Sequence, residues 1–285
     1  MGCLVSTDAG VDVAAKMESW SRKALRSSSS TAFGCTRIRG APGSTSSVRR
    51  DTRPALLPGP ATPRHPRRRG RTRASSRGYG IDDVVAHYSQ AIGELDTKPI
   101  VIGHSFGGLI AQRLLGQDLA AAAVGIDPAP IKGVLYLPPS ALRVASVALR
   151  NPANRHRAVS LTEEQFRYGF GNAISEEESN ELYHRWTIPS PGKPLFEAAI
   201  ANFSPGSPAT VDTKNATRGP LLLTAGGEDH TVPAAITRST LKQYRKSTAV
   251  TEVREFPDKG HSLALDGGWR EVADSVLAWL EERSL

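Results

Sequence analysis

The clearest chemical signal in this 285-residue chain is a serine set among glycines. The segment reads Gly103-His104-Ser105-Phe106-Gly107-Gly108. It fits the spacing Gly-x-Ser-x-Gly, follows an apolar run at 99–102 and opens an apolar helical stretch. A serine on a tight strand-to-helix turn projects its hydroxyl above the sheet, and the glycines leave room for the strained backbone. We therefore expect Ser105 to be a nucleophile, with the backbone N–H of Phe106 as an oxyanion donor.

A serine nucleophile needs a base, and the chain offers a histidine and an acid in suitable places. Asp229 comes shortly after the apolar run 221–225, and His261 comes shortly after the run 251–256. With a serine on such a turn, the acid and then the histidine come later in the chain, each after a strand. His261 would take the proton of Ser105, and Asp229 would hold His261 in the required tautomer. The predicted catalytic residues are Ser105, Asp229 and His261.

Other acids and histidines compete for these roles: Asp127, Glu228, Asp258, His104 and His230. Glu228 is adjacent to the predicted acid, but a shift of one residue turns its side chain away. Asp127 follows the predicted strand 121–126 and is an alternative acid, whereas Asp258 is near the predicted base in sequence only. We expect His104 and His230 to be structural or supporting residues.

The elements that must position these residues alternate along the chain from residue 81 onward. Apolar runs predict buried strands at 99–102, 121–126, 221–225 and 251–256. Apolar residues at helical spacing predict helices at 81–95, 109–115, 233–244 and 269–280. This alternation predicts a three-layer α/β/α fold with a mostly parallel sheet.

Changes in composition divide the chain into three regions. We assign residues 81–136 and 209–285 to the α/β core. Between them, residues 137–208 are rich in aromatic residues and proline, and we expect a helical insertion there. Residues 1–80 are predicted to form a basic, low-complexity, disordered segment, because their apolar residues are too few to offset the entropy of ordering.

The net charge of +8 is concentrated near the N-terminus. Residues 20–80 hold fifteen Lys or Arg and one acid, a net +14, which leaves −6 for the rest of the chain. Five arginines between positions 67 and 73 could contact phosphate groups, so a nucleic-acid or membrane-surface binder is one alternative. No aromatic platform accompanies them, and we therefore expect a solvated tail and no nucleic-acid partner.

The two cysteines, Cys3 and Cys35, have no His or Cys at metal-ligand spacing, and two cysteines do not make a disulfide scaffold. No apolar run approaches the roughly 18 residues that cross a bilayer. The N-terminus lacks a clear apolar core of a secretory signal. We expect a cytoplasmic protein with no metal, no cofactor and no membrane association.

Residues 81–285 resemble the α/β-hydrolase superfamily, in particular bacterial esterase and lipase-like members with a helical cap. The resemblance rests on the motifs at 103–108, at 226–233 and at Gly260-His261. It implies cofactor-free acyl transfer through an acyl-Ser105 intermediate, with residues 137–208 as the cap that shapes substrate choice. The chain does not resemble the dehalogenase or epoxide-hydrolase branches, which place an aspartate at the nucleophile position.

Members of this superfamily begin with further strands and with a His-Gly loop that donates a second oxyanion N–H, and residues 1–80 contain no such loop. Losing one donor typically costs about 10²–10³ in rate, and losing the strands beside Ser105 would uncover a sheet edge. We hypothesise that residues from about 24 to 77 are an out-of-frame translation, because a shifted reading permits residues 29–36 to encode Val-His-Gly-Leu-Trp-Leu-His. A natural disordered extension is the alternative, and sequencing the gene distinguishes the two.

These residues together predict a serine hydrolase that cleaves a carboxylic ester, or a related acyl bond, of an apolar small molecule. A catalytically impaired relic or a binding module is the alternative, because the second oxyanion donor has no visible source. Lipase, thioesterase, lactonase, peptidase and perhydrolase activities stay open, because the same three residues can serve each of them.

Overall fold

The computed structural model describes residues 3–6, 34–37, 55–58 and 78–285. Its main sheet has five strands in the order β1-β4-β5-β8-β9. Their bounds are β1 Cys3–Ser6, β4 Ile100–His104, β5 Ala122–Ile126, β8 Leu221–Gly226 and β9 Thr251–Phe256. Two further short strands, β2 (Gly34–Arg37) and β3 (Ala55–Pro58), pair with each other.

Strands β4, β5, β8 and β9 are parallel, so their carboxyl ends meet at one edge of the sheet. At the other side of β4, strand β1 pairs antiparallel, with Cys3 opposite Gly103 and Ser6 opposite Ile100. From the sequence, losing the strands beside Ser105 would uncover a sheet edge. In the structure, β1 pairs with the backbone groups of β4 on this side.

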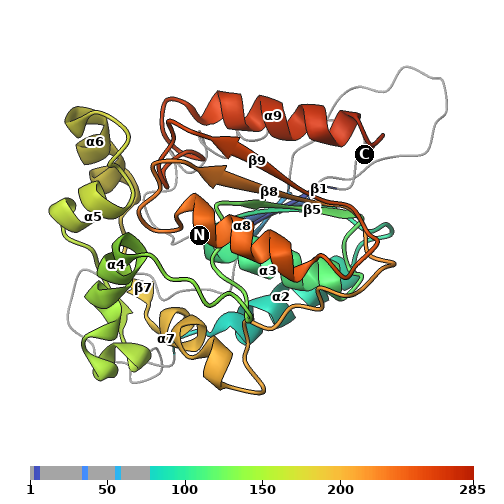
Figure 1. The fold of residues 1–285 in the computed structure, drawn as a ribbon, viewed down its shortest axis with the longest axis horizontal. Helices are drawn as coiled ribbons and strands as arrows, with labels where there is room; N and C mark the ends of the chain where they lie inside the picture. Colours follow the sequence, from blue (N-terminus) through green and yellow to red (C-terminus); the bar gives the residue numbers. More distant parts are fainter. Residues whose placement is uncertain (1–2, 7–33, 38–54, 59–77) are drawn as a thin grey trace.

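Of the helices that the structure describes, four cover the two faces of the sheet (Figure 1). Three of them lie on one face: α2 (Ile81–Gly93), α3 (Phe106–Gly116) and α8 (Ala234–Gln243). The fourth, α9 (Trp269–Glu281), lies on the opposite face. The predicted three-layer α/β/α fold with a mostly parallel sheet is confirmed, and each helix and strand predicted from residue 81 onward is present, with ends shifted by a few residues at most.

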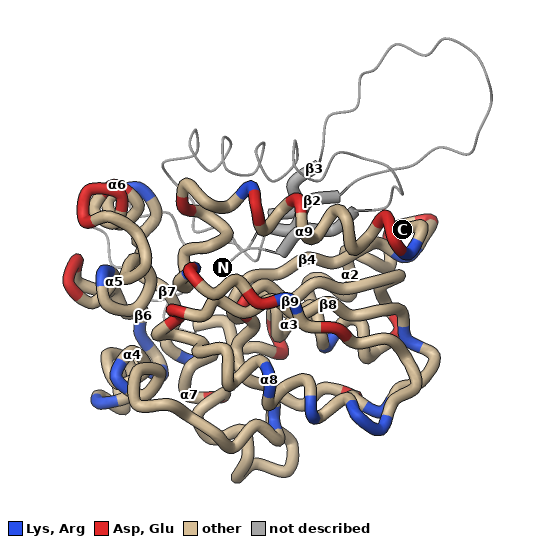
Figure 2. The backbone as a smooth tube through the Cα atoms, turned by 45° about the horizontal axis from the view of Figure 1, so that its top comes forward, with Lys and Arg blue, Asp and Glu red and all other residues tan. Residues whose placement is uncertain are grey.

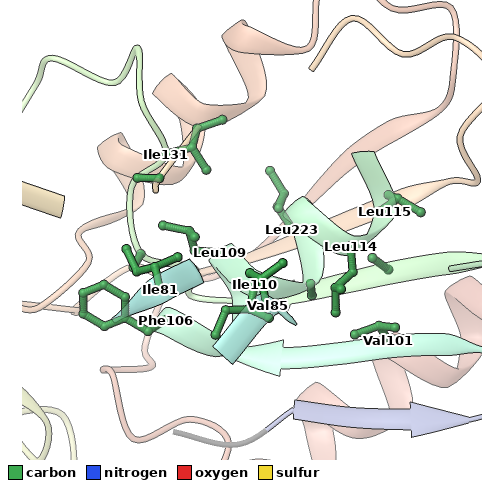
Figure 3. Packing of buried hydrophobic residues seen from close by; sticks show 14 of the residues in the cluster. Ile81, Val85, Val101, Phe106, Leu109, Ile110, Leu114, Leu115, Ile131 and Leu223 are labelled. Carbon is green, nitrogen blue, oxygen red and sulfur yellow. The ribbon is translucent and has the colours of Figure 1, made fainter. Parts of the chain in front are cut away.

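The two faces of the sheet bury two separate apolar clusters. Side chains alternate along β4, so that Val101 packs with α2, α3 and α8, whereas Ile100 and Ile102 pack with α9. In β8, Leu223 packs in the first of these clusters and Leu222 packs in the second. Figure 3 shows the first cluster. Because successive strand residues point to opposite faces, an almost continuous apolar run supplies both cores.

The chain between β5 and β8 forms an insertion, which Figure 1 shows beside the carboxyl ends of the strands. Its helices are α4 (Pro139–Leu149), α5 (Glu163–Gly169), α6 (Glu176–Trp186) and α7 (Lys193–Ala199), with the 3₁₀ turns η1 (Pro152–His156) and η2 (Ala201–Phe203). Strands β6 (Ala158–Val159) and β7 (Ser190–Pro191) form a short antiparallel pair. Side-chain oxygens of Thr162 and Ser175 accept backbone N–H groups and so begin α5 and α6.

Charged residues of both signs are interspersed over the described backbone (Figure 2). Residues 78–285 hold twenty Lys or Arg and twenty-four Asp or Glu, a net −4. The basic excess of the chain therefore belongs to residues 1–77, and the predicted disorder of this segment falls largely outside the described residues. None of the helices that the structure describes is long and apolar enough to span a bilayer.

Replacement of Trp279 by alanine tests the packing of α9. The indole is fully buried against the sheet, and its N–H donates to Glu252 Oε2 over 3.1 Å. We expect Trp279→Ala to lower the free energy of unfolding by about 3–5 kcal/mol, measured by urea denaturation. The control is Leu142→Ala, a leucine that is 51% exposed, with an expected change below about 0.5 kcal/mol. Equal changes in the two variants would contradict this packing.

Candidate active site

Ser105 occupies a strained turn between β4 and α3. Its backbone has φ 56° and ψ −120°, which is a conformation that few residues other than glycine adopt. The N–H of Ser105 donates to the carbonyl of Ile126 over 2.9 Å, and its carbonyl accepts the N–H of Ala129 over 2.9 Å. These bonds tie the turn to the end of β5, so that the neighbouring strand maintains the strained conformation.

Glycine is required on both sides of this turn for reasons of space. A Cβ on Gly103 would lie 2.1 Å from the carbonyl oxygen of Gly107, and a Cβ on Gly108 would lie 2.7 Å from the Cβ of Pro128. Real Cβ atoms do not approach other atoms this closely. The glycines of the motif therefore allow the chain to fold back on itself and to place α3 against the strand.

The hydroxyl of Ser105 lies at the N-terminal end of α3. The first N–H groups of a helix have no intrahelical acceptor, so the N–H of Phe106 is available to an anion near Ser105. The predicted absence of a second donor concerns residues 1–80, which lie largely outside the described residues.

His261 links Ser105 to Asp229 through both nitrogens of its ring. Its Nε2 is 3.0 Å from Ser105 Oγ, and its Nδ1 is 2.6 Å from Asp229 Oδ2. An ionised carboxylate can only accept, so the proton of the neutral imidazole lies on Nδ1, and Nε2 is left to accept the hydroxyl of Ser105. The three residues predicted from the sequence therefore lie together in one hydrogen-bonded chain. The side chain of His261, at the centre of this chain, is fully buried.

Asp229 receives further support from its own loop. Its Oδ1 accepts the N–H of Thr231 over 2.6 Å and the N–H of Val232 over 2.8 Å. Burial raises the pKa of Asp229, but the charge of His261 and the hydrogen bonds to the carboxylate outweigh this effect. The pKa of Asp229 lies below its usual value, so the group is ionised at neutral pH.

The histidine next to the serine has a supporting position. His104 Nε2 donates to the backbone carbonyl of His261 over 2.9 Å, and the two rings lie 4.7 Å apart. Burial lowers the pKa of His104 well below its usual value, and the charge of His261 lowers it further. A neutral His104 therefore holds the loop that carries His261. His230 bonds the carbonyl of Tyr168 through Nδ1, outside the hydrogen-bonded chain.

The competing acids differ in how far their side chains are buried. Glu228 and Asp258 are both exposed, and Asp258 pairs with Lys259 at 3.1 Å. Asp127 is different, because it is fully buried and one of its carboxyl oxygens lies within 4.8 Å of a carboxyl oxygen of Asp229.

Aromatic residues of the insertion reach His261. The ring of Phe170 meets the His261 ring edge to face at 4.8 Å, and Phe166 stacks on Phe170 at 5.3 Å. The same stretch bonds to the loop of Asp229, since Thr231 Oγ1 donates to the carbonyl of Gly169 over 2.6 Å. The sequence shows these aromatic residues but does not predict this contact, because their spacing does not say which of them faces His261.

Asp127, Asp229 and His261 are also of the residue types that bind metal ions, and one ligand atom of each lies within 4.8 Å of the others. Both nitrogens of His261 already have hydrogen-bond partners, and Asp229 accepts three bonds. A metal ion would have to break the bond between His261 and Asp229. The arrangement therefore fits proton transfer better than it fits metal binding.

Comparison with known proteins identifies the family. The family model described as "Alpha/beta hydrolase family" matches residues 40–275, and the chain therefore belongs to this family. The match begins within the basic segment and includes the whole insertion.

Several solved structures are similar in fold. They include a monoacylglycerol lipase of Paleococcus ferrophilus (21% identity, 72% of this chain and 76% of that chain, TM-score 0.48), a methylesterase from Arabidopsis (15%, 72% and 77%, 0.47) and a pyrethroid hydrolase from Sphingobium faniae (17%, 71% and 78%, 0.48). No protein of curated function matches the sequence significantly.

Replacement of Gly103 by alanine tests the turn. We expect Gly103→Ala to destabilise the fold and to displace Ser105, because the new Cβ would overlap the backbone of Gly107. Thermal unfolding and reaction of Ser105 with a fluorophosphonate measure the two effects. The control is Gly93→Ala, where a Cβ meets no atom within 4 Å and the residue ends α2, so that the melting temperature stays the same or rises. A stable, reactive Gly103→Ala variant would contradict the geometry of the turn.

Proposed function

We propose that the protein is a serine hydrolase that cleaves a carboxylic ester, or a related acyl bond, of an apolar small molecule. The observation that carries this proposal is the position of His261, whose two ring nitrogens lie 3.0 Å from Ser105 Oγ and 2.6 Å from Asp229 Oδ2. A base between a hydroxyl and a buried carboxylate is the arrangement that activates serine.

In the first half of the reaction, Ser105 Oγ attacks the ester carbonyl while His261 Nε2 accepts the hydroxyl proton. The negative charge moves to the carbonyl oxygen, where the N–H of Phe106 stabilises it. Asp229 stabilises the imidazolium that forms. When the tetrahedral intermediate collapses, the ester C–O bond breaks and His261 returns its proton to the leaving alkoxide, which departs as an alcohol.

The second half uses the same groups with water as the nucleophile. Water loses a proton to His261 and adds to the acyl-Ser105 carbonyl. Collapse of this intermediate releases the acid and returns the proton to Ser105 Oγ. No cofactor enters these steps, since each proton transfer passes between His261 and an oxygen atom.

We also propose that the insertion, residues 137–208 of the predicted domain division, acts as a cap over this site. The ring of its residue Phe170 contacts the ring of His261, and Phe166 stacks on Phe170. Apolar rings at this position favour an apolar acyl or alcohol group, because binding such a group removes apolar surface from water.

Replacement of Ser105 by alanine tests the proposed nucleophile. We expect the wild-type protein to form a covalent adduct with a fluorophosphonate and to hydrolyse p-nitrophenyl esters. Ser105→Ala should form no adduct and lose at least about 10⁴ in kcat. Mass spectrometry locates the adduct, and circular dichroism controls for folding. A folded wild-type protein without an adduct at Ser105 would overturn the proposal in favour of an impaired relic or a binding module.

Replacement of Phe170 by alanine tests the proposed cap. The contact between its ring and His261 is worth about 0.5–1.5 kcal/mol beyond burial, so kcat/KM should fall roughly 3- to 10-fold for apolar esters. The control is Phe203→Ala, an aromatic residue of the same insertion that is 88% exposed, with an unchanged kcat/KM. A series of acyl chain lengths measures both, and equal effects of the two substitutions would contradict the role of Phe170.

A further inference from the structure

A second buried aspartate lies behind Asp229. Asp127 follows the last residue of β5, is completely buried and has a left-handed backbone with φ 41°. Both of its carboxyl oxygens lie 3.1 Å from the N–H of Gly226, and Thr224 Oγ1 donates to Oδ1 over 3.3 Å. The side chain is therefore held by residues of β8, the strand that leads to Asp229.

One carboxyl oxygen of Asp127 lies within 4.8 Å of a carboxyl oxygen of Asp229, and both side chains are buried. The two groups can share a hydrogen bond only if one of them is protonated, because an ionised carboxylate has no proton to donate. Two buried carboxylates in contact are also unstable when both are charged, because their repulsion is poorly screened away from water. The pair therefore holds one proton at neutral pH.

The partners of the two groups decide which of them holds this proton. Asp229 accepts two backbone N–H groups and the Nδ1–H of His261, which together favour the charged form. One of the four lone pairs of its carboxylate is left for a further donor. From the described residues, the Asp127 carboxyl accepts only one backbone N–H and one weak hydroxyl bond. Burial, together with the charge of Asp229, raises the pKa of Asp127 well above its usual value.

We infer that Asp127 is a protonated positioning residue, whose carboxyl O–H donates to Asp229 and extends the chain Ser105–His261–Asp229 by one member. It does not touch the reacting atoms, and it acts by fixing the carboxylate that orients the base. The protonation of Asp127 does not depend on the proposed function, whereas its effect on catalysis rests on that function.

A neutral Asp127 allows His261 to act as a base, because it adds no second negative charge beside the ring. Among the described acids and histidines, Asp229 and His261 each have a side-chain atom within 4.8 Å of one in Asp127, and β8 contributes Thr224 and Gly226. With Asp127 neutral, the site has one negative charge. A second negative charge would stabilise the imidazolium, which cannot accept a proton from Ser105.

Asparagine at position 127 distinguishes the two protonation states. Its amide can donate to Asp229 and accept from Gly226, as a protonated carboxyl does, and it has no charge. We expect the pKa of His261, measured by NMR titration of its ring signals, to change by less than about 0.3 in Asp127→Asn. If Asp127 is ionised, Asp127→Asn removes a negative charge, and the pKa of His261 should fall by about one unit. That result would overturn the inference.

Activity provides the second measurement. We expect Asp127→Ala to lower kcat about 10- to 100-fold, because Asp229 loses its donor and the base loses its fixed orientation. The conservative Asp127→Asn variant should recover kcat to within about threefold of wild type. Equal losses in the two variants would contradict the role of a neutral donor. The control is Asp258→Asn, an exposed acid three residues before His261 in sequence, which should change neither quantity.

The two measurements separate this inference from the proposed function, because the NMR titration needs no turnover. A wild-type protein that forms no Ser105 adduct, but whose His261 pKa is unchanged by Asp127→Asn, overturns the function and supports the protonated aspartate. An active enzyme whose His261 pKa falls in Asp127→Asn supports the function and overturns the protonated aspartate.

Discussion

The hydrogen bond between His261 and Asp229 is the interaction on which the site depends. Both side chains are fully buried, and at 2.6 Å the bond joins an ionised carboxylate to an imidazole without water. Burying a charge is costly unless hydrogen bonds compensate for the lost water. The N–H groups of Thr231 and Val232 supply this compensation, and Asp127 completes it under the inference above. Residues 226–233 therefore have to form a tight loop whose backbone N–H groups donate to the Asp229 carboxylate.

The parallel sheet brings residues together that are distant in the sequence. Ser105 lies more than a hundred positions before Asp229 and His261, but each of the three follows a strand whose carboxyl end lies at the same edge. The strained turn at Ser105 is maintained by backbone bonds to β5, and the absence of a Cβ at Gly103 allows α3 to start at once. Apolar burial on both faces of the sheet stabilises this arrangement.

The insertion is coupled to the site through its contacts with the acid loop. Thr231 bonds to Gly169, and Asn172 Nδ2 donates to the carbonyl of Glu228 over 2.6 Å, so a shift of the insertion would displace the loop that holds Asp229. Phe170 adds a direct contact with the His261 ring. Under the proposed function, the segment that contacts the substrate thus also restrains the base.

The sequence by itself determined the alternation of strands and helices and the serine turn, because apolar periodicity and the space needed around Gly103 are local properties. It also singled out Asp229 and His261, since each follows a strand. Only the tertiary structure decided that the carboxyl groups of Asp127 and Asp229 lie close together, that β1 pairs with the edge of β4 and that the ring of Phe170 contacts His261. These contacts join residues far apart in the chain, and the packing of whole elements, which no local pattern encodes, selects them.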